Sequence, residues 1–397
     1  MILAGDFWQK PPPSSISLAE MLAGADVQGM PRHKPIEAMS NCDRGLAIFR
    51  DARRTVLTQQ MRAAEDTEFQ EELLQLRNTA REDPVPISLL ESLREVSDAD
   101  VAEHPPWAFA TIAVLSNYER HHLNRKQAEA FARAHSLPIV MWRLPLTGRA
   151  AELLDDIMLH DLYENEPGLW GVFVRGAPAM LTANIQPTKF LVNGACGYMH
   201  SLSFPDEAPD VLVTEASGLG FRRVVLEEPP LTVNFQLSLP DGDDGAGIET
   251  LVDGYVVVPI VKSHHAETHD TASLWACMKC VPKTLRFHKH PVDLSFAVTD
   301  YKLQGKTLDE LILSIAPRPF MPRLDLKGFY VMVSRVRTRK RLRVLHKPAR
   351  AKGALDLLAK MRHTPELSAW DAGYDASGDW KAATVTVKRR RMAKGPE

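Results

Sequence analysis

Short apolar runs alternate with amphipathic segments along the first 166 residues. The runs Met1–Ala4, Ala110–Leu115 and Ile139–Trp142 predict buried strands, because each is short and apolar and ends at glycine or polar residues. Glu68–Thr79 and Asn117–Ser136 carry apolar residues at helical spacing and predict helices that cover a sheet. This strand–helix–strand order is typical of an α/β fold.

The pattern becomes β-rich after Pro167 and returns to the α/β type after His290. Short apolar runs separated by Gly, Pro and Asp predict a small barrel or sandwich; they lie at Val172–Val174, Phe190–Val192, Arg223–Leu226 and Tyr255–Ile260. Later runs predict three more strands, at Leu294–Thr299, Leu308–Ile315 and near Leu342–Leu345. We therefore expect one α/β domain interrupted by an inserted β module.

Composition is that of an ordinary globular protein, with 45% hydrophobic and 25% charged residues and a net charge of −2. It excludes wholesale disorder and a coiled-coil rod. Four cysteines do not make a disulfide scaffold and fit a reducing compartment. No apolar run approaches the ~18 residues of a membrane helix, and no signal peptide is visible. We expect a soluble intracellular protein without a membrane partner.

Charge is unevenly distributed along the chain. Nine basic residues and no acidic residue lie between Arg335 and Lys352, whereas Glu65–Asp100 is rich in acids. A basic run can attract phosphate backbones, but it can also be a solvated strand edge. The further basic cluster Lys388–Arg391 fits a flexible tail or a nuclear-localisation patch, so we expect a nuclear protein.

Five sequence blocks carry the candidate chemistry, and they occur in a fixed order. They are Gly5–Pro12, Leu57–Arg62, Gly176–Gly197, Ala297–Asp309 and Tyr330–Arg337. In this order they resemble the C-terminal motifs of Pif-type DNA helicases, including the helicase part of Helitron transposons. That family belongs to helicase superfamily 1 and is related to RecD-type enzymes. The resemblance extends from Leu3 to about Leu345.

The resemblance implies a RecA-like P-loop NTPase fold with five segments. They are a remnant of the first RecA-like domain (1–54), the first part of the second (55–166), an inserted barrel-like module (167–290), the last part of the second domain (291–346) and a basic tail (347–397). It also implies an ATP- and Mg²⁺-dependent helicase that unwinds DNA 5′ to 3′. The expected settings are repair, recombination, telomere maintenance or transposon replication.

The family's residue roles transfer to matching positions of this chain. Gln9, Arg62 and Arg335 resemble the residues that act on ATP: a phosphate-sensing amide, a phosphate-binding arginine and an arginine finger. The remaining nucleotide-site positions are Asp6, Gln304 and Gly305. The expected contacts to single-stranded or duplex DNA are Thr299, Tyr301, Lys302, Thr307 and Asn193. Arginine suits phosphate because its planar fork is permanently charged.

The chain also departs from the family pattern. The 397 residues contain no Walker A motif, because Gly305-Lys306-Thr307 is preceded by Asp300 where that motif has glycine. A Walker B Asp-Glu pair, which would hold Mg²⁺, should lie upstream of Gly5. We therefore expect an N-terminally truncated helicase whose isolated chain is inactive. Tyr301 and Leu303 replace the family's His and Ser.

Simpler interpretations remain open for each position. Gln9 can be a loop amide, Arg62 a helix-surface charge, and Arg335 part of a solvated basic stripe. Cys277 and Cys280 have the spacing of half a zinc site, or they are two thiols of the inserted module. Trp107 is either a base-stacking platform or, as we expect, a core residue.

Two alternative functions follow from these simpler interpretations. One is a catalytically inactive fragment that at most binds single-stranded nucleic acid. The other is a zinc-stabilised interaction module, and it depends on Cys277 and Cys280 alone.

Overall fold

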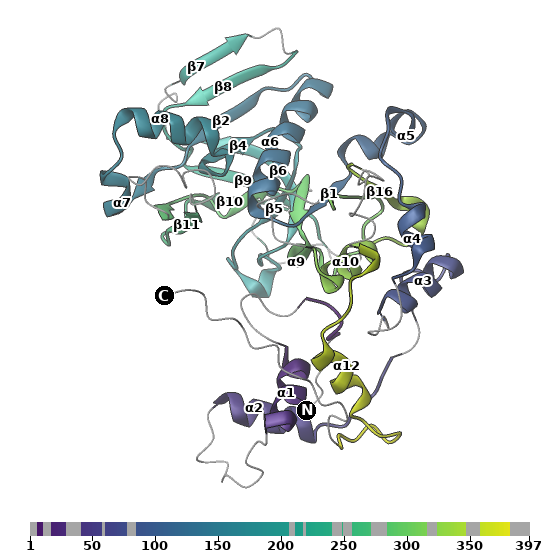
Figure 1. Ribbon diagram of the computed structural model, residues 1–397. Coiled ribbons are helices and arrows are strands. Elements are labelled where there is room, and N and C mark those ends of the chain that lie inside the picture. Colours follow the sequence, from purple (N-terminus) through teal and green to yellow (C-terminus); the bar gives the residue numbers. More distant parts are fainter. Residues whose placement is uncertain are drawn as a thin grey trace. The chain divides into compact units, whose positions relative to one another are not determined.

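A computed structural model describes most of the chain as two units. The described residues are 6–10, 17–28, 41–57, 60–77, 85–205, 211–216, 220–239, 248, 256–270, 284–315, 324–346 and 358–381. Unit 1 comprises residues 1–96, 303–317 and 323–397, and unit 2 comprises 97–302 and 318–322. Figure 1 shows the ribbon of both units.

Unit 1 is built mainly from helices. They are α1 (Leu18–Gln28), α2 (Asn41–Asp51), α3 (Thr67–Arg77), α4 (Ile87–Ser92), α10 (Leu326–Val333) and α12 (Pro365–Ala372), with the 3-10 turn η5 (Arg339–Arg341). Aspartates begin two of these helices: Asp66 accepts from the Phe69 N–H at 3.1 Å, and Asp325 from the Gly328 N–H at 2.7 Å. Every residue of α10 is buried, so the neighbouring segments cover this helix on all sides.

Two short parallel strands of unit 1, β15 (Leu311–Leu313) and β16 (Leu342–Val344), pair in register and are fully buried. Elsewhere in the unit, α1, α2 and α12 lie side by side (Figure 1) and share a core that includes Trp8, Leu22, Phe49 and Trp370. The Glu20 carboxylate of α1 accepts from Lys327 of α10 at 2.9 Å and from Thr364, before α12, at 2.7 Å. This carboxylate joins three helices that are distant in sequence.

Unit 2 begins with helical segments and a parallel strand pair. These elements are α5 (Asp98–Glu103), η2 (Pro105–Phe109), β1 (Thr111–Val114), α6 (Asn117–Ala134), β2 (Ile139–Arg143), β3 (Leu146–Thr147), α7 (Arg149–Glu152), α8 (Asp156–Asn165) and η3 (Pro167–Leu169). Strand β1 pairs in parallel with β14 (Ala297–Thr299). Trp107 is 4% exposed, which supports a core tryptophan.

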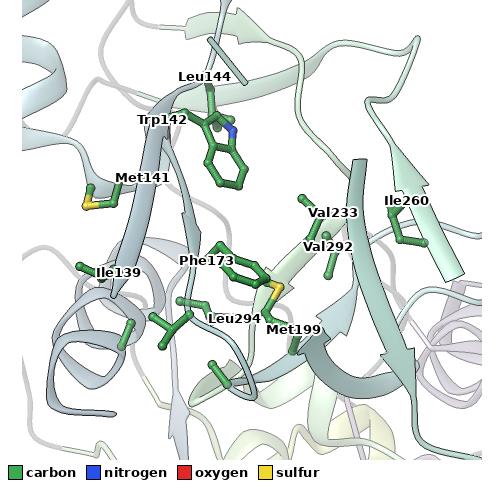
Figure 2. Packing of buried hydrophobic residues seen from close by; sticks show 14 of the residues in the cluster. Ile139, Met141, Trp142, Leu144, Phe173, Met199, Val233, Ile260, Val292 and Leu294 are labelled. Carbon is green, nitrogen blue, oxygen red and sulfur yellow. The ribbon is translucent and has the colours of Figure 1, made fainter. Parts of the chain in front are cut away.

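The remaining strands of unit 2 are mostly antiparallel. They are β4 (Trp170–Phe173), β5 (Pro178–Leu181), β6 (Cys196–Ser203), β7 (Val211–Ala216), β8 (Arg222–Leu226), β9 (Thr232–Leu237), β10 (Val257–Val261), β11 (Glu267–Asp270), β12 (Thr284–Phe287) and β13 (Val292–Leu294). They form sheets of order β10-β9-β6-β5-β13, β4-β2-β8-β7 and β11-β12-β3. Figure 2 shows part of their shared core, where Trp142, Phe173 and Met199 are labelled.

The expected closed barrel is not seen among the described strands. The five-stranded sheet ends at β10 and β13, which do not pair with each other, so it is open. Strand β2 belongs to the segment before residue 167, yet it pairs with β4 and β8 of the predicted insert. Part of the predicted insert therefore shares one sheet with a strand that precedes it in sequence.

Two predicted strands differ from the structure. Phe190–Val192 lies in a turn after the 3-10 segment η4 (Pro187–Lys189), because Phe190 has a left-handed backbone. Leu294–Thr299 is split at Ser295 and Phe296, because the chain leaves β13 in the antiparallel sheet and enters β14 beside β1. The predicted strand Met1–Ala4 lies outside the described residues.

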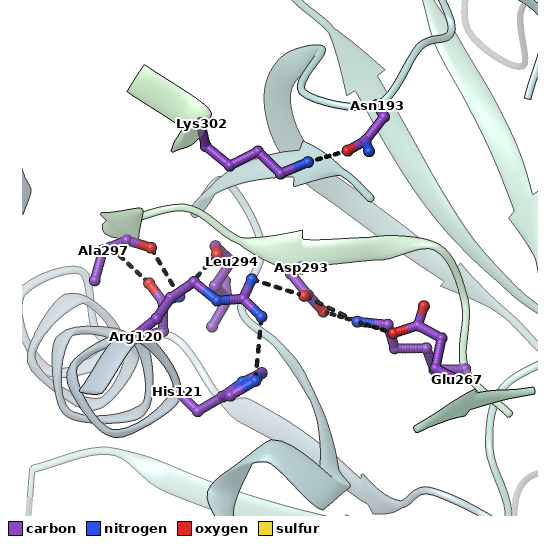
Figure 3. A network of polar contacts seen from close by, with 10 residues as sticks. Arg120, His121, Asn193, Glu267, Asp293, Leu294, Ala297 and Lys302 are labelled. Carbon is purple, nitrogen blue, oxygen red and sulfur yellow. Dashed lines mark hydrogen bonds and ion pairs between the residues drawn. The ribbon is translucent and has the colours of Figure 1, made fainter. Parts of the chain in front are cut away.

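Asn124 of α6 satisfies the backbone at this change of sheet. Its side-chain N–H group donates to the carbonyls of Leu294 at 2.9 Å and Ala297 at 3.2 Å, and its oxygen accepts from the Ala297 N–H at 2.7 Å (Figure 3). Asn124 is 6% exposed. An unpaired polar group at this depth would be costly, so one side chain replaces the missing strand partners.

We predict that Asn124→Leu lowers the free energy of unfolding by about 2–4 kcal/mol, because three buried backbone groups lose their partner. The measurement is denaturant unfolding of the whole chain. Asn165→Ala is the matched control, since Asn165 is exposed and its side chain bonds only within α8; we expect a change within about 0.5 kcal/mol. Equal losses in the two variants would contradict the role given to Asn124.

Candidate functional site

Arg335 is a buried arginine at the end of α10. It directly follows Ser334, and it is 2% exposed. Its Nε donates to the Val331 carbonyl at 2.7 Å and its Nη2 donates to the Ser334 hydroxyl at 2.6 Å. No carboxylate of the described residues forms an ion pair with it within 4.0 Å. Arg335 is therefore not part of a solvated stripe.

Arg62 reaches the same serine from a turn that precedes α3. Its Nη1 donates to the Ser334 carbonyl at 2.8 Å, although the two residues are 272 positions apart. Its Nε donates to the Thr307 hydroxyl at 2.9 Å. Arg62 lies in a turn and not on a helix surface, so the simpler interpretation of this residue is wrong. Two guanidinium groups thus meet at one residue of unit 1.

Arg62 and Arg335 carry like charges, and their repulsion disfavours the charged form of Arg335. Burial, and next the positive charge of Arg62, lower the pKa of Arg335 to about 10. Burial also lowers the pKa of Arg62. Tyr330 of α10 has a raised pKa, first because of burial and then because of the Asp6 carboxylate. Two like charges in a partly dehydrated place favour the approach of an anion.

The loop that carries Asp6 and Gln9 lies close enough for the Asp6 charge to act on Tyr330 and Arg335. The Gln9 side-chain N–H donates to the Asp6 carboxylate at 3.1 Å, and Arg77 of α3 lies 3.6 Å from the same carboxylate. Asp6 acts in turn on the pKa of Tyr330 and of Arg335. Gln9 is thus a loop amide bonded within its own turn, and Asp6 connects it to the arginines.

Gln304 and Gly305 stand at the start of the next segment of unit 1. The Gln304 side chain donates to the Lys10 carbonyl at 3.0 Å, which ties this block to the Asp6–Gln9 loop. The Lys10 ammonium group lies 2.8 Å from Asp325, the cap of α10. Gly305 has φ +79°, a left-handed backbone that favours glycine.

The expected DNA contacts divide between the two units. Thr299 ends β14, and helix α9 (Asp300–Leu303) follows with Tyr301 and Lys302. Figure 3 shows the Lys302 ammonium group bonded to the Asn193 side-chain oxygen. These four residues belong to unit 2, whereas Thr307 belongs to unit 1, where it bonds to Arg62.

Two arginines of the remaining basic run form ion pairs with acids. Arg339 lies 3.0 Å from Glu68 and 3.0 Å from Glu72, both on α3, and Arg341 lies 2.5 Å from Glu310. The Asp66 carboxylate accepts from the Arg339 backbone N–H at 2.9 Å. The acid-rich segment therefore neutralises part of the basic run, which a count of charges does not reveal.

Sequence reasoning did not single out Ser334 and Tyr330. Tyr330 lies on α10 and Ser334 directly after it, one helical turn apart, and the Ser334 N–H donates to the Tyr330 carbonyl at 3.1 Å. A sequence signal does exist for this region. The apolar run Phe329–Val333 follows a capping residue, Asp325, and predicts a helix that ends near Ser334.

A second polar cluster fills the interior of unit 2 (Figure 3). Arg120 lies 3.0 Å from Asp293, and Lys289 lies 2.9 Å from the same carboxylate and 3.4 Å from Glu267. Burial alone would raise the pKa of Asp293, but the charges of Lys289 and Arg120 hold it well below its usual value. A cavity of about 50 Å³ adjoins this cluster.

No group of three His, Cys, Asp or Glu side chains suited to a metal ion occurs in the part of the chain that the structure describes. Cys277 and Cys280 lie outside that part. Among the described residues, no helix is both long and apolar enough to cross a membrane.

Comparisons with known proteins find similarity only at the level of solved structures. No protein-family profile matches the sequence, and no curated protein matches it either. The structure of Pif1 helicase from Candida albicans is 17% identical, with TM-score 0.47, over 79% of this chain and 59% of that chain. Bacteroides Pif1 bound to ssDNA is 15% identical, with TM-score 0.46, over 84% of this chain and 60% of that one.

A further similar structure is Bacteroides Pif1 in complex with ADP-AlF3 and ssDNA, at 16% identity and TM-score 0.43. It is matched over 84% of this chain and 60% of that chain. The chain thus spans about three fifths of the length of these solved proteins.

We predict that Arg335→Met raises the free energy of unfolding by roughly 1 kcal/mol, because an apolar side chain replaces a dehydrated cation that has no carboxylate partner. Denaturant unfolding at neutral pH measures this. Arg339→Met is the matched control, and we expect it to lose about 1–3 kcal/mol because Glu72 is left buried without its partner. A loss in Arg335→Met as large as in the control would contradict the prediction.

Proposed function

We propose that the chain is part of an ATP-dependent DNA helicase of the Pif type that moves 5′ to 3′ along one strand. The observation that carries the proposal is the meeting of Arg62 and Arg335 at Ser334. These arginines belong to two separate sequence blocks that resemble the same helicase family. Their convergence is what a shared phosphate site requires.

The arginine pair fits the terminal phosphate of a nucleotide. Two planar, permanently charged groups, one buried and one half-buried, can each donate to phosphate oxygens. Gln9 would approach the same phosphate if its bond to Asp6 opened. ATP hydrolysis would supply the free energy for strand separation, and a fixed cation such as Arg335 would stabilise the negative charge that develops on the transferred phosphate.

The nucleic-acid part of the proposal rests on unit 2. Lys302 offers a positively charged group that donates to the side-chain oxygen of Asn193. Tyr301 is 40% exposed on the same helix and presents a ring that a base can stack on. Thr299 offers a hydroxyl at the end of β14. This combination suits a single strand.

A second candidate function is binding of single-stranded nucleic acid without hydrolysis. It is favoured by one observation: the 397 residues contain no GxxxxGK[ST] sequence. A P-loop supplies the backbone N–H groups that hold the β-phosphate.

We predict that the 397-residue protein binds a fluorescently labelled oligothymidylate and does not hydrolyse ATP, because the P-loop motif is missing from it. Fluorescence anisotropy measures the binding, and phosphate release measures the hydrolysis. Lys302→Ala is expected to weaken binding and to reduce the slope of log affinity against log salt by about 0.7, the contribution of one phosphate contact on a single strand.

Lys126→Ala is the matched control, since Lys126 is an exposed lysine of α6 on the same unit. We expect it to leave the salt slope unchanged. Absence of oligothymidylate binding would contradict the nucleic-acid role. DNA-stimulated hydrolysis that is lost in Arg335→Ala would contradict the inactivity of the isolated chain and support the full helicase reaction.

A further inference from the structure

Phe190 adopts a backbone conformation that bulky residues avoid. Its φ is +59°, and Ser136 is the other non-glycine residue with positive φ among the described residues. The left-handed conformation costs an L-residue roughly 1–2 kcal/mol, and glycine is the usual residue at such a helix end. Phe190 is also 46% exposed, so burial of its ring does not offset the strain.

The strained residue is held by a closed loop. Leu191 is 3% exposed and anchors the loop in the core of unit 2. The Ile185 N–H donates to the Leu191 carbonyl at 2.8 Å, and the Asn193 N–H donates to the Asn184 side chain at 2.8 Å. These bonds staple the two arms of the segment from Asn184 to Asn193. The Phe190 ring is therefore presented to solvent on a fixed support.

The sequence around this loop contains basic residues and no acidic ones. The sequence has no Asp or Glu from residue 167 to residue 205, whereas it has Arg175 and Lys189. Asn193 at the end of the loop holds the Lys302 ammonium group (Figure 3). An exposed aromatic ring thus lies on the same short loop as an amide that holds a fixed cation.

We propose that Phe190 is a base-stacking residue for single-stranded nucleic acid, with the strand's phosphates near Lys302. The proposal rests on the proposed function, since it deepens the nucleic-acid contact of unit 2. Every base has an aromatic face, so a ring on a rigid loop binds a strand without sequence preference. The unbroken absence of acids over the loop fits a polyanion better than an acidic or neutral protein surface.

Phe190→Gly separates binding from folding. Glycine adopts φ +59° without strain, so this variant should be at least as stable as the wild type while lacking the ring. We expect its affinity for oligothymidylate to fall about 5- to 100-fold. Phe190→Tyr should keep the wild-type affinity. Fluorescence anisotropy gives the affinities, and thermal unfolding gives the stabilities.

An oligonucleotide of abasic sites tests the stacking itself. The wild type should bind the abasic strand more weakly than oligothymidylate, and Phe190→Gly should lose much of this difference. Ile157→Ala is the matched control, because Ile157 is 74% exposed on α8 among acidic residues; its affinity should not change.

Unchanged oligothymidylate affinity in a folded Phe190→Gly variant would overturn the inference and leave the proposed function standing. Absence of oligothymidylate binding by the wild type would overturn both.

Discussion

The central interaction of unit 1 is the hydrogen bonding of two guanidinium groups to one serine. Arg62 and Arg335 donate to the two oxygens of Ser334, and burial together with the Arg62 charge lowers the pKa of Arg335 to about 10. Hydrogen bonds to neutral oxygens position these cations but leave their charge uncompensated. Tyr330 and, after it, the Asp6 carboxylate offset the lowering of the pKa of Arg335 in part. Such an arrangement of partly dehydrated cations is suited to the reversible binding of an anion.

Other arginines near this site form ion pairs with glutamates. Arg339 bonds to Glu68 and Glu72, and Arg341 bonds to Glu310. These acids neutralise two arginines of the basic run that follows Arg335 in sequence. In unit 2, the sequence from residue 167 to residue 205, which includes Phe190, contains no Asp or Glu.

Much of the fold could be predicted from local patterns, but the meeting of distant residues could not. Apolar runs located the strands β1, β2 and β8, and helical spacing located α3 and α6. The run Leu294–Thr299 was read as one strand, because apolar spacing does not show that a chain changes sheets where Asn124 can replace the lost partners. Phe190 was read as part of a strand, since its residue type favours strands and only tertiary anchoring by Leu191 forces the left-handed turn. The sequence blocks contain both arginines and Ser334, but a local pattern does not show that Arg62 and Arg335 both donate to that serine.

We expect Arg62 and Arg335 to bind one anion together. The most direct test is isothermal titration calorimetry of the 397-residue chain with tripolyphosphate, repeated for Arg62→Met, Arg335→Met and the control Arg339→Met. Because a charge-assisted hydrogen bond contributes roughly 1.5–3 kcal/mol, we expect each of the first two variants to bind about tenfold or more weakly and the control to bind like the wild type. Equal affinity in the wild type and in both Arg62→Met and Arg335→Met would contradict the account.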